Sequence, residues 1–177
     1  MMKVFILSLA MLSGTVICAQ VGDQFPMLIG QKIDGKAVDL PEGTQGKFTL
    51  LGMAWSKKAE PAFESWINPV YNKFIAKTGM MDDVYDINVF FIPMFTGVKK
   101  GAMDDVMDKM KAKSSEEIFP YVLFYKGELE PYEASLKLEN KEFPYIFLLD
   151  KTGKIVWKTK GRFSEDKMFE MEQIILK

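Results

Sequence analysis

Hydrophobic residues follow two alternating patterns along the first half of the chain. Near-continuous apolar runs at 47–55 and 85–95 are typical of strands that are covered on both faces of a sheet. The segment between them carries one broad apolar face at helical spacing, which predicts an amphipathic helix. The residues of that face are Phe63, Trp66, Ile67, Val70, Tyr71 and Phe74. Pro69 lies inside this helix and removes a backbone donor, so we expect a kink near Asn68.

The flanking segments predict two hairpins and two further helices. Residues 25–43 place two short apolar runs around Asp34-Gly35, a dipeptide favoured in tight turns, and predict an antiparallel hairpin. Thr152-Gly153 predicts a second hairpin, between the apolar run at 145–150 and a final strand. Ser164 can cap a last helix, whose inward face carries Met168, Met171, Ile174 and Ile175. The other helix is indicated by Met103, Val106, Met107 and Met110 at helical spacing.

The order of these elements defines a fold class. Two strands are followed by β-α-β-α, then by a short run at 121–125, and then by a β-β-α ending. Strands that alternate with helices before a closing hairpin predict one α/β layer sandwich with a mixed sheet. The methionines at 103, 107 and 110 are expected in its core, although their adaptable side chains would also suit a partner surface.

Composition narrows the class of protein. The chain has 177 residues, of which 48% are hydrophobic and 27% charged, as in an ordinary globular domain. A net charge of −1 and a pI near 5.7 give no basic footprint for nucleic acid. The acidic stretches near 81–86 and 102–109 lack the alternating acids and central glycine of a calcium loop.

The first residues resemble an export signal. Lys3 precedes an apolar run of about 13 residues, shorter than the roughly 20 needed to span a bilayer, and Ala19 is suited to cleavage. We therefore expect a signal peptide at 1–19, a mature domain at 20–177 and a location in the periplasm or cell envelope. Cys18 raises the alternative of a lipoprotein, which Ile17 disfavours because processing sites prefer a small residue there.

Two absences limit the chemistry. The sequence contains no histidine, the commonest general base near neutral pH and the commonest metal ligand. Cys18 is the only cysteine, so a chain cleaved after Ala19 has no thiol at all. We expect no metal site of the His and Cys type and no cofactor, since phosphate loops and nucleotide fingerprints are also absent.

Two segments resemble the thioredoxin-like family, especially its exported branch. "KFTLLGMAWSKKAEPAFESW" is similar to the family's strand, active-site turn and first helix, and "FPYIFLLDKTGKIVWKTKG" is similar to its cis-proline strand and closing hairpin. The resemblance covers about residues 25–177 and implies a three-layer sandwich with an N-terminal hairpin and a cis peptide before Pro144. "SWINPVYNKF" and "LENKEFPYIFLLDKTGKIVW" also resemble the thioredoxin-like assembly factor of mitochondrial ATP synthase.

The turn that carries two cysteines in redox-active relatives reads Trp-Ser-Lys-Lys here. Neither a thiolate nor a resolving cysteine is present around Ser56, so disulfide exchange and peroxidase activity are not expected. Ser56 reads as the N-cap of the following helix. With Lys57 and Lys58 it is also a candidate for binding an anion or a partner's carboxylate at the helix N-terminus.

The resemblance implies a peptide-binding groove that needs no cysteine. In the family, the backbone just before the cis-proline pairs with an extended segment of the partner, here at Phe143. The candidate groove residues are Trp55, Ser56, Lys57, Lys58, Phe143 and Pro144.

These features favour an exported, redox-inactive protein that binds another protein or an extended peptide. A chaperone or assembly factor, with a membrane protein as one possible client, is the most concrete form of this hypothesis. The alternatives are an enzyme with a non-thiol site around Ser56 and Lys57, and a purely structural module. A serine enzyme would require a lysine desolvated enough to lose its proton.

Overall fold

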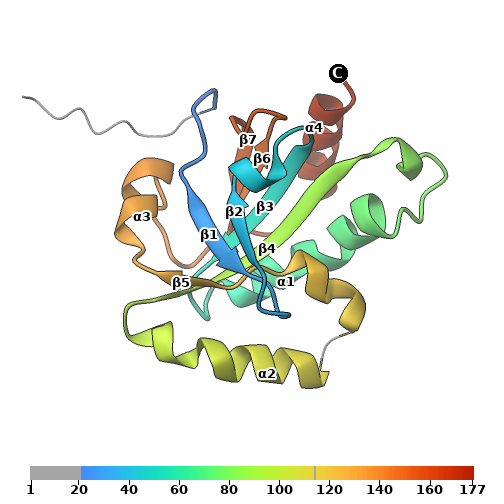
Figure 1. Cartoon of the computed structure of the whole chain (residues 1–177). Helices are drawn as coiled ribbons and strands as arrows, with labels where there is room; N and C mark the ends of the chain where they lie inside the picture. Colours follow the sequence, from blue (N-terminus) through green and yellow to red (C-terminus); the bar gives the residue numbers. More distant parts are fainter. Residues whose placement is uncertain (1–20, 114) are drawn as a thin grey trace, which may run out of the picture.

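A five-stranded mixed sheet lies at the centre of the computed structural model, which describes residues 21–113 and 115–177 (Figure 1). The strands are β1 (Leu28–Gln31), β2 (Ala37–Leu40), β3 (Phe48–Ala54), β4 (Ile87–Thr96), β5 (Tyr125–Gly127), β6 (Tyr145–Leu149) and β7 (Ile155–Lys160). The α-helices are α1 (Glu60–Val70), α2 (Met103–Lys113), α3 (Glu130–Leu136) and α4 (Glu165–Ile175). The leader expected at 1–19, with Cys18, lies outside the described residues and stays a prediction.

The sheet has the strand order β5-β4-β3-β6-β7. β3 pairs in parallel with β4, which pairs in parallel with β5, whereas β6 is antiparallel to both β3 and β7. β1 and β2 form a separate antiparallel hairpin in which Leu28 faces Leu40. The mixed sheet and the N-terminal hairpin confirm the predicted fold class, and every residue of β3 from Thr49 to Ala54 is buried, as its continuous apolar run predicts.

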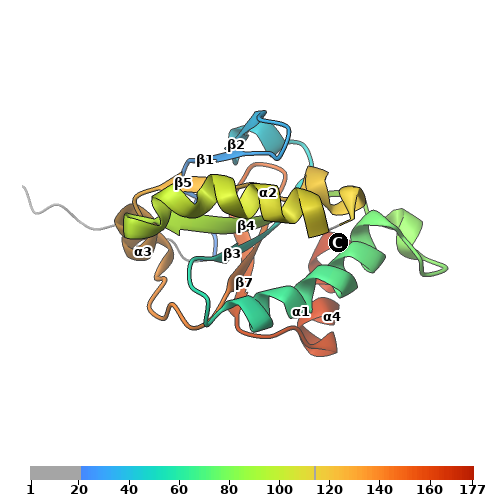
Figure 2. The same cartoon turned by 90° about the horizontal axis from the view of Figure 1, so that it is seen from below.

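The two faces of the sheet are covered by different elements (Figure 2). Helices α1, α2 and α4 contribute to one core, in which Trp66, Met107 and Met171 are packed against β3, β4 and β6. The β1–β2 hairpin and α3 cover the other face, where Phe25, Leu40 and Leu136 are buried. These are the three layers expected of a thioredoxin-like domain.

Glycine at position 52 allows α1 to pack closely on the central strand. A Cβ built there would lie 2.9 Å from a carbon of the Phe63 ring and 3.3 Å from Ile146. The ring of Phe63 also packs edge-on against Phe91 of β4, with the centroids 5.9 Å apart. The first turn of α1 is therefore fixed against the carboxyl ends of two parallel strands.

The predicted helical faces are largely confirmed. Phe63, Trp66, Val70 and Phe74 are buried, and Pro69 is followed by a π-helical turn at Tyr71–Ile75. The interruption expected near Asn68 thus takes the form of a widened turn, which is one of the ordinary helix irregularities. Met103 and Met107 are buried and Met110 is partly buried, as expected of core residues, while Val106 is exposed. Ser164 accepts a hydrogen bond from the Lys167 amide and caps α4 as predicted.

One expectation about the backbone is wrong, and one helix was missed. Helix α3 was not predicted, because its seven residues contain only two buried side chains, Tyr132 and Leu136, too few to define a helical period. The peptide before Pro144 is not cis: within the described residues the cis bond is Leu40–Pro41. Trans is the commoner isomer of an X–Pro bond, and a likeness in sequence around Pro144 does not fix the isomer.

A cation links three elements at the edge of the helical layer. Lys73 lies 3.1 Å from Asp82 and 2.8 Å from Glu172 of α4, and its ammonium is 5.2 Å from the centre of the Tyr85 ring. The hydrogen bond to Glu172, followed by that to Asp82, raises the pKa of Lys73 above its ordinary value despite burial. This cluster connects the π-helical turn, the loop before β4 and the C-terminal helix.

The indole of Trp66 fills part of the core and also forms a hydrogen bond to the backbone, so its replacement is expected to destabilise the fold. Its side chain is fully buried, and its Nε1 donates a 2.8 Å hydrogen bond to the carbonyl of Gly161. Replacement by phenylalanine should lower the free energy of unfolding by about 2 kcal/mol, since it leaves a cavity and an unpaired buried carbonyl. The measurement is the urea unfolding curve.

Trp157→Phe is the matched control. Trp157 Nε1 donates to the carboxylate of exposed Glu170, where water can replace the lost partner. We expect Trp157→Phe to cost clearly less than Trp66→Phe. Equal losses would show that the bond to Gly161 has no special weight.

Candidate functional site

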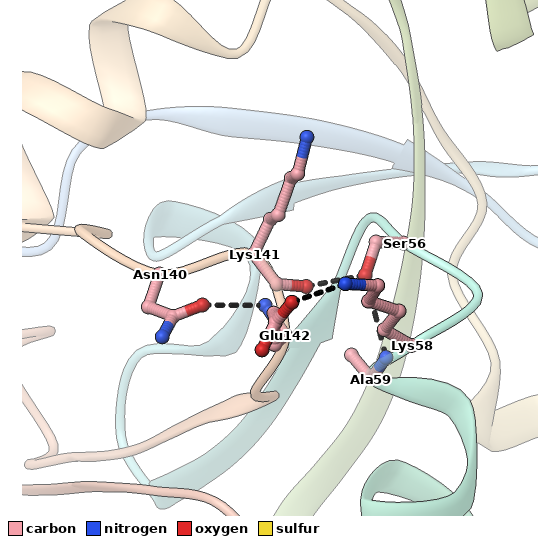
Figure 3. A network of polar contacts seen from close by, with 6 residues as sticks. All are labelled: Ser56, Lys58, Ala59, Asn140, Lys141 and Glu142. Carbon is pink, nitrogen blue, oxygen red and sulfur yellow. Dashed lines mark hydrogen bonds and ion pairs between the residues drawn. The ribbon is translucent and has the colours of Figure 1, made fainter.

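The Trp-Ser-Lys-Lys turn lies between the end of β3 and the start of α1, and it meets the loop that leads into β6 (Figure 3). Polar contacts join the two segments, which are about 85 residues apart in sequence. Ser56 donates its hydroxyl to the carbonyl of Lys141, and the Lys58 ammonium forms an ion pair with Glu142. The turn and the loop therefore behave as one connected unit.

The Ser56 hydroxyl both donates and accepts a hydrogen bond at this turn. Its Oγ accepts a 3.3 Å bond from the Ala59 amide while it donates to Lys141. The expectation that Ser56 is the N-cap is wrong, because α1 begins at Glu60 and its N-cap residue is Ala59. The hydroxyl instead closes the turn that precedes the helix, where the Ala59 amide is also 3.1 Å from the Ser56 carbonyl.

Lys58 is stabilised in its protonated form, whereas a catalytic base must be deprotonated. Its hydrogen bond to Glu142, with the attraction of that charge, raises the pKa of Lys58 above its ordinary value. A lysine that activates a serine must lose its proton near neutral pH, which requires a lowered pKa. The same contact lowers the pKa of Glu142.

Four further hydrogen bonds hold the loop. The Glu142 amide donates to Asn140 Oδ1 over 2.8 Å, and the Asn140 amide donates to the Tyr145 hydroxyl over 3.0 Å. Pro144 is buried, and its carbonyl accepts from the Gly161 amide over 2.9 Å. Phe143 is 40% exposed, while its amide is directed to the carbonyl of Asn140, 3.4 Å away.

These contacts bear directly on the predicted peptide groove. Ser56 and Lys58 are brought next to the loop before Pro144, as the resemblance implies, but they contact that loop directly. The space between Ser56 and Phe143 is thus bridged by the protein's own groups. The Phe143 amide is already bonded within its own loop, so a peptide that paired with it would compete with that bond.

Trp55 is a core residue that lies next to the Ser56 turn. Its side chain is buried and stacks on Tyr145 with the ring centroids 5.6 Å apart and the planes at 24°. Its carbonyl accepts a 3.1 Å hydrogen bond from Lys99. Trp55 therefore connects the bridged loop on one side with the segment after β4 on the other.

An apolar pocket lies on that second side, and the sequence patterns did not reveal it. Its volume is about 220 Å³, and it sits at the carboxyl ends of the parallel strands β3 and β4, where α/β folds commonly place ligands. Its lining includes Trp55, Lys57, Phe63, Phe95, Lys99 and Val106. The sequence carried no signal for this pocket, because Val106 follows the same helical spacing as the methionines around it and its 37% exposure appears only in the structure.

The described residues contain neither a cluster of metal ligands nor a helix that could cross a membrane. Within residues 21–113 and 115–177, no group of three or more Asp, Glu, Cys or His side chains is arranged to hold a metal ion. In the same part of the chain, none of the helices combines the length and the apolar character required to cross a bilayer.

The bridge between turn and loop yields a prediction about local opening. Ser56→Ala removes the bond to Lys141, so the amides of Glu142 and Phe143 should exchange with solvent about fivefold faster, the effect of one hydrogen bond. Glu142→Gln should have a smaller effect because its ion pair with Lys58 is solvent-exposed. Native-state hydrogen exchange measures both.

Lys57→Ala is the control for this experiment, since Lys57 is exposed and does not belong to the network drawn in Figure 3. It should leave the exchange rates of the loop unchanged. A further check is pH: because the Glu142 pKa is lowered, its contribution is present above the ordinary glutamate pKa and is lost as pH falls through the lowered value. Unchanged exchange in Ser56→Ala would show that the loop is held by other contacts.

Solved structures share this fold at low sequence identity. A putative thiol:disulfide interchange protein DsbE from Chlorobium tepidum is 23% identical with a TM-score of 0.57, covering 89% of this chain and 97% of that one. BsSco, a member of the Sco family of cytochrome c oxidase assembly proteins, is 18% identical with a TM-score of 0.59, covering 85% and 92%. A pneumococcal lipoprotein thioredoxin, Etrx1 from Streptococcus pneumoniae, is 16% identical with a TM-score of 0.56, covering 84% and 98%. These likenesses confirm the thioredoxin-like fold.

The family comparison corrects the expected location. No curated protein matches the chain, but the profile of the ATP10 protein family does, over residues 16–175. The proteins of that family are assembly factors of the mitochondrial ATP synthase, so the expectation of an exported protein in the periplasm or cell envelope is wrong. The leader-like residues misled because a short apolar run after a lysine is a weak signal of destination. Since the profile spans nearly the whole sequence and includes both the turn and the loop of the site, the chain belongs to the ATP10 protein family.

Proposed function

We propose that this protein is an assembly factor that acts by binding another protein, without thiol–disulfide chemistry. The observation that carries the proposal is the family match over residues 16–175, combined with a turn that holds serine and lysine where a thiol would be required. A serine hydroxyl cannot form or exchange a disulfide. The fold of the redox proteins is therefore retained for another use.

The polar network supports a binding role over an enzymatic one. The Ser56 hydroxyl donates a hydrogen bond to the Lys141 carbonyl and accepts one from the Ala59 amide. Lys58 is stabilised in its charged form by Glu142. Nucleophilic catalysis by serine needs a free hydroxyl beside a proton acceptor. The Ser56 hydroxyl is already hydrogen-bonded and Lys58 is held in its charged form, so the network does not favour a serine enzyme at this turn.

The apolar pocket beside Ser56 is the binding site that the geometry supports. Phe63 and Phe95 line it from α1 and β4, and Val106 of α2 is 37% exposed at its border. The volume of about 220 Å³ suits one or two apolar side chains of a partner rather than a large cofactor. Val98, which is fully exposed, directly precedes the pocket residue Lys99 in the segment between β4 and α2.

Charged groups at the pocket favour a partner with a mixed surface. Lys57 and Lys99 line the pocket together with Glu60, so cations outnumber the anion. An apolar segment that carries a carboxylate would place its apolar side chain inside and its charge near Lys57. Subunits of ATP synthase are the partners that the family membership supports.

The pocket can be tested by introducing a charge at its border. Val106→Glu should reduce partner binding by about tenfold or more, because a carboxylate at an apolar contact must be desolvated on binding. The measurement is the amount of assembled ATP synthase on native gels of cells in which the variant replaces the original chain. We expect a level close to that of cells lacking the chain.

Val84→Glu is the matched control, since Val84 is more exposed, at 55%, and lies away from the pocket. It should support normal assembly. Failure of both variants would point to lost folding, which circular dichroism would reveal. Normal assembly in Val106→Glu would remove the pocket from the proposal, and normal assembly in cells lacking the chain would overturn the proposed function itself.

A further inference from the structure

The strand β7 offers an unpaired edge on the side of the molecule away from β4 and α2. It is the last strand of the sheet and pairs with β6 along one edge only. On its other edge, the backbone of Gly22 and Asp23 bonds to Ile155, and among the described residues this pairing goes no further along the strand. At the far end, Lys167 takes the carbonyl oxygen of Lys160. Among the described residues, 156–160 therefore have no strand partner on this edge, and the Lys160 carbonyl is already bonded to Lys167.

A basic hollow adjoins this edge. Its volume is about 340 Å³, and it is formed by the end of β7, the start of β6 and the segment after α3. Leu136 and Tyr145, both buried in the core, contribute its apolar surface. Three lysines also line it, namely Lys137, Lys158 and Lys160, against a single acidic residue, Glu139.

The register of the sheet places two of these lysines on one face. Lys158 is opposite Phe147 and Lys160 is opposite Tyr145, and both aromatic residues belong to the core under the β1–β2 hairpin and α3. Lys158 and Lys160 therefore project from that same face, two residues apart, or about 6.7 Å along the strand. Lys137 is the residue with left-handed backbone angles that directly follows α3.

The charges of these lysines are not neutralised within the described part of the chain. The ion pairs formed there involve seven lysine–acid contacts, and none of them includes Lys137, Lys158 or Lys160. Two copies of the protein that paired through β7 would set these cations against one another, which disfavours a second copy as the occupant. An acidic segment would remove the repulsion.

We propose that the edge of β7 binds an extended acidic segment of a partner protein by strand addition, with its carboxylates held by Lys137, Lys158 and Lys160. Backbone bonds to residues 156–160 supply a sequence-independent attraction, and acids at every second position of the added strand match the spacing of Lys158 and Lys160. The apolar part of the hollow accommodates the methylene groups of those acids. This surface is separate from the pocket beside Val106, and the inference does not depend on that pocket.

The probe for this site is a fluorescein-labelled nine-residue peptide of alternating threonine and glutamate. Fluorescence anisotropy with the full chain should show saturable binding that weakens as salt is raised. The double variant Lys158→Glu/Lys160→Glu should weaken binding at least tenfold. The matched control is Lys109→Glu/Lys126→Glu, which makes the same charge change at exposed residues of α2 and β5 and should bind like the original chain.

A second peptide separates strand addition from simple charge attraction. It has the same sequence but carries N-methyl groups on alternate amides, which block pairing through one edge while the charges are unchanged. Loss of binding with this peptide, together with slower amide exchange at residues 156–160 in the complex with the first peptide, supports the inference. Equal binding of the two peptides, or no binding of either, overturns it. Either result leaves the test of Val106→Glu unaffected.

Discussion

The burial of β3 between two layers is the constraint on which the rest of the structure depends. Its residues from Thr49 to Ala54 are covered on one face by α1 and on the other by the β1–β2 hairpin and its neighbours. Gly52 leaves room for the Phe63 ring, because a Cβ at this position would lie 2.9 Å from it, and so the first turn of α1 packs closely on the strand. That close packing fixes the Trp-Ser-Lys-Lys turn at the carboxyl end of the sheet, beside the loop that leads into β6.

At that place a turn without cysteine is held by structural contacts. In thioredoxin-like redox proteins, a helix N-terminus stabilises a thiolate that must remain accessible. Here a serine and a lysine connect the turn to Lys141 and Glu142, and the raised pKa of Lys58 shows that the network favours the charged, paired state. The consequence is an ordered surface on one side of Trp55 and an open apolar pocket on its other side. A protein that recognises partners gains from such order, because less conformational freedom is lost on binding.

Much of the fold could be predicted from the sequence, because its strongest signals are local. The continuous apolar run of β3 and the periodic face of α1 report burial directly, and Thr152-Gly153 reports the turn between β6 and β7. Helix α3 was not predicted because its two buried residues, Tyr132 and Leu136, are too few to define a helical period. The isomer before Pro144 and the true N-cap of α1 depend on tertiary contacts that no local pattern contains. Lys141 and Glu142 were missed as partners of Ser56 and Lys58 for the same reason, since exposed polar residues in a loop carry no signal of what they contact.

The central claim is that this member of the ATP10 protein family acts in assembly by binding, with no thiol step. Cys18 is the only sulfhydryl group that the full sequence could supply, so its removal tests the claim most directly. The measurement is the amount of assembled ATP synthase on native gels of cells whose only copy of the chain is Cys18→Ser, compared with cells that carry the original chain. We expect the same amount in both; failure of assembly in Cys18→Ser, while the variant accumulates to its normal level, would show that a thiol is required.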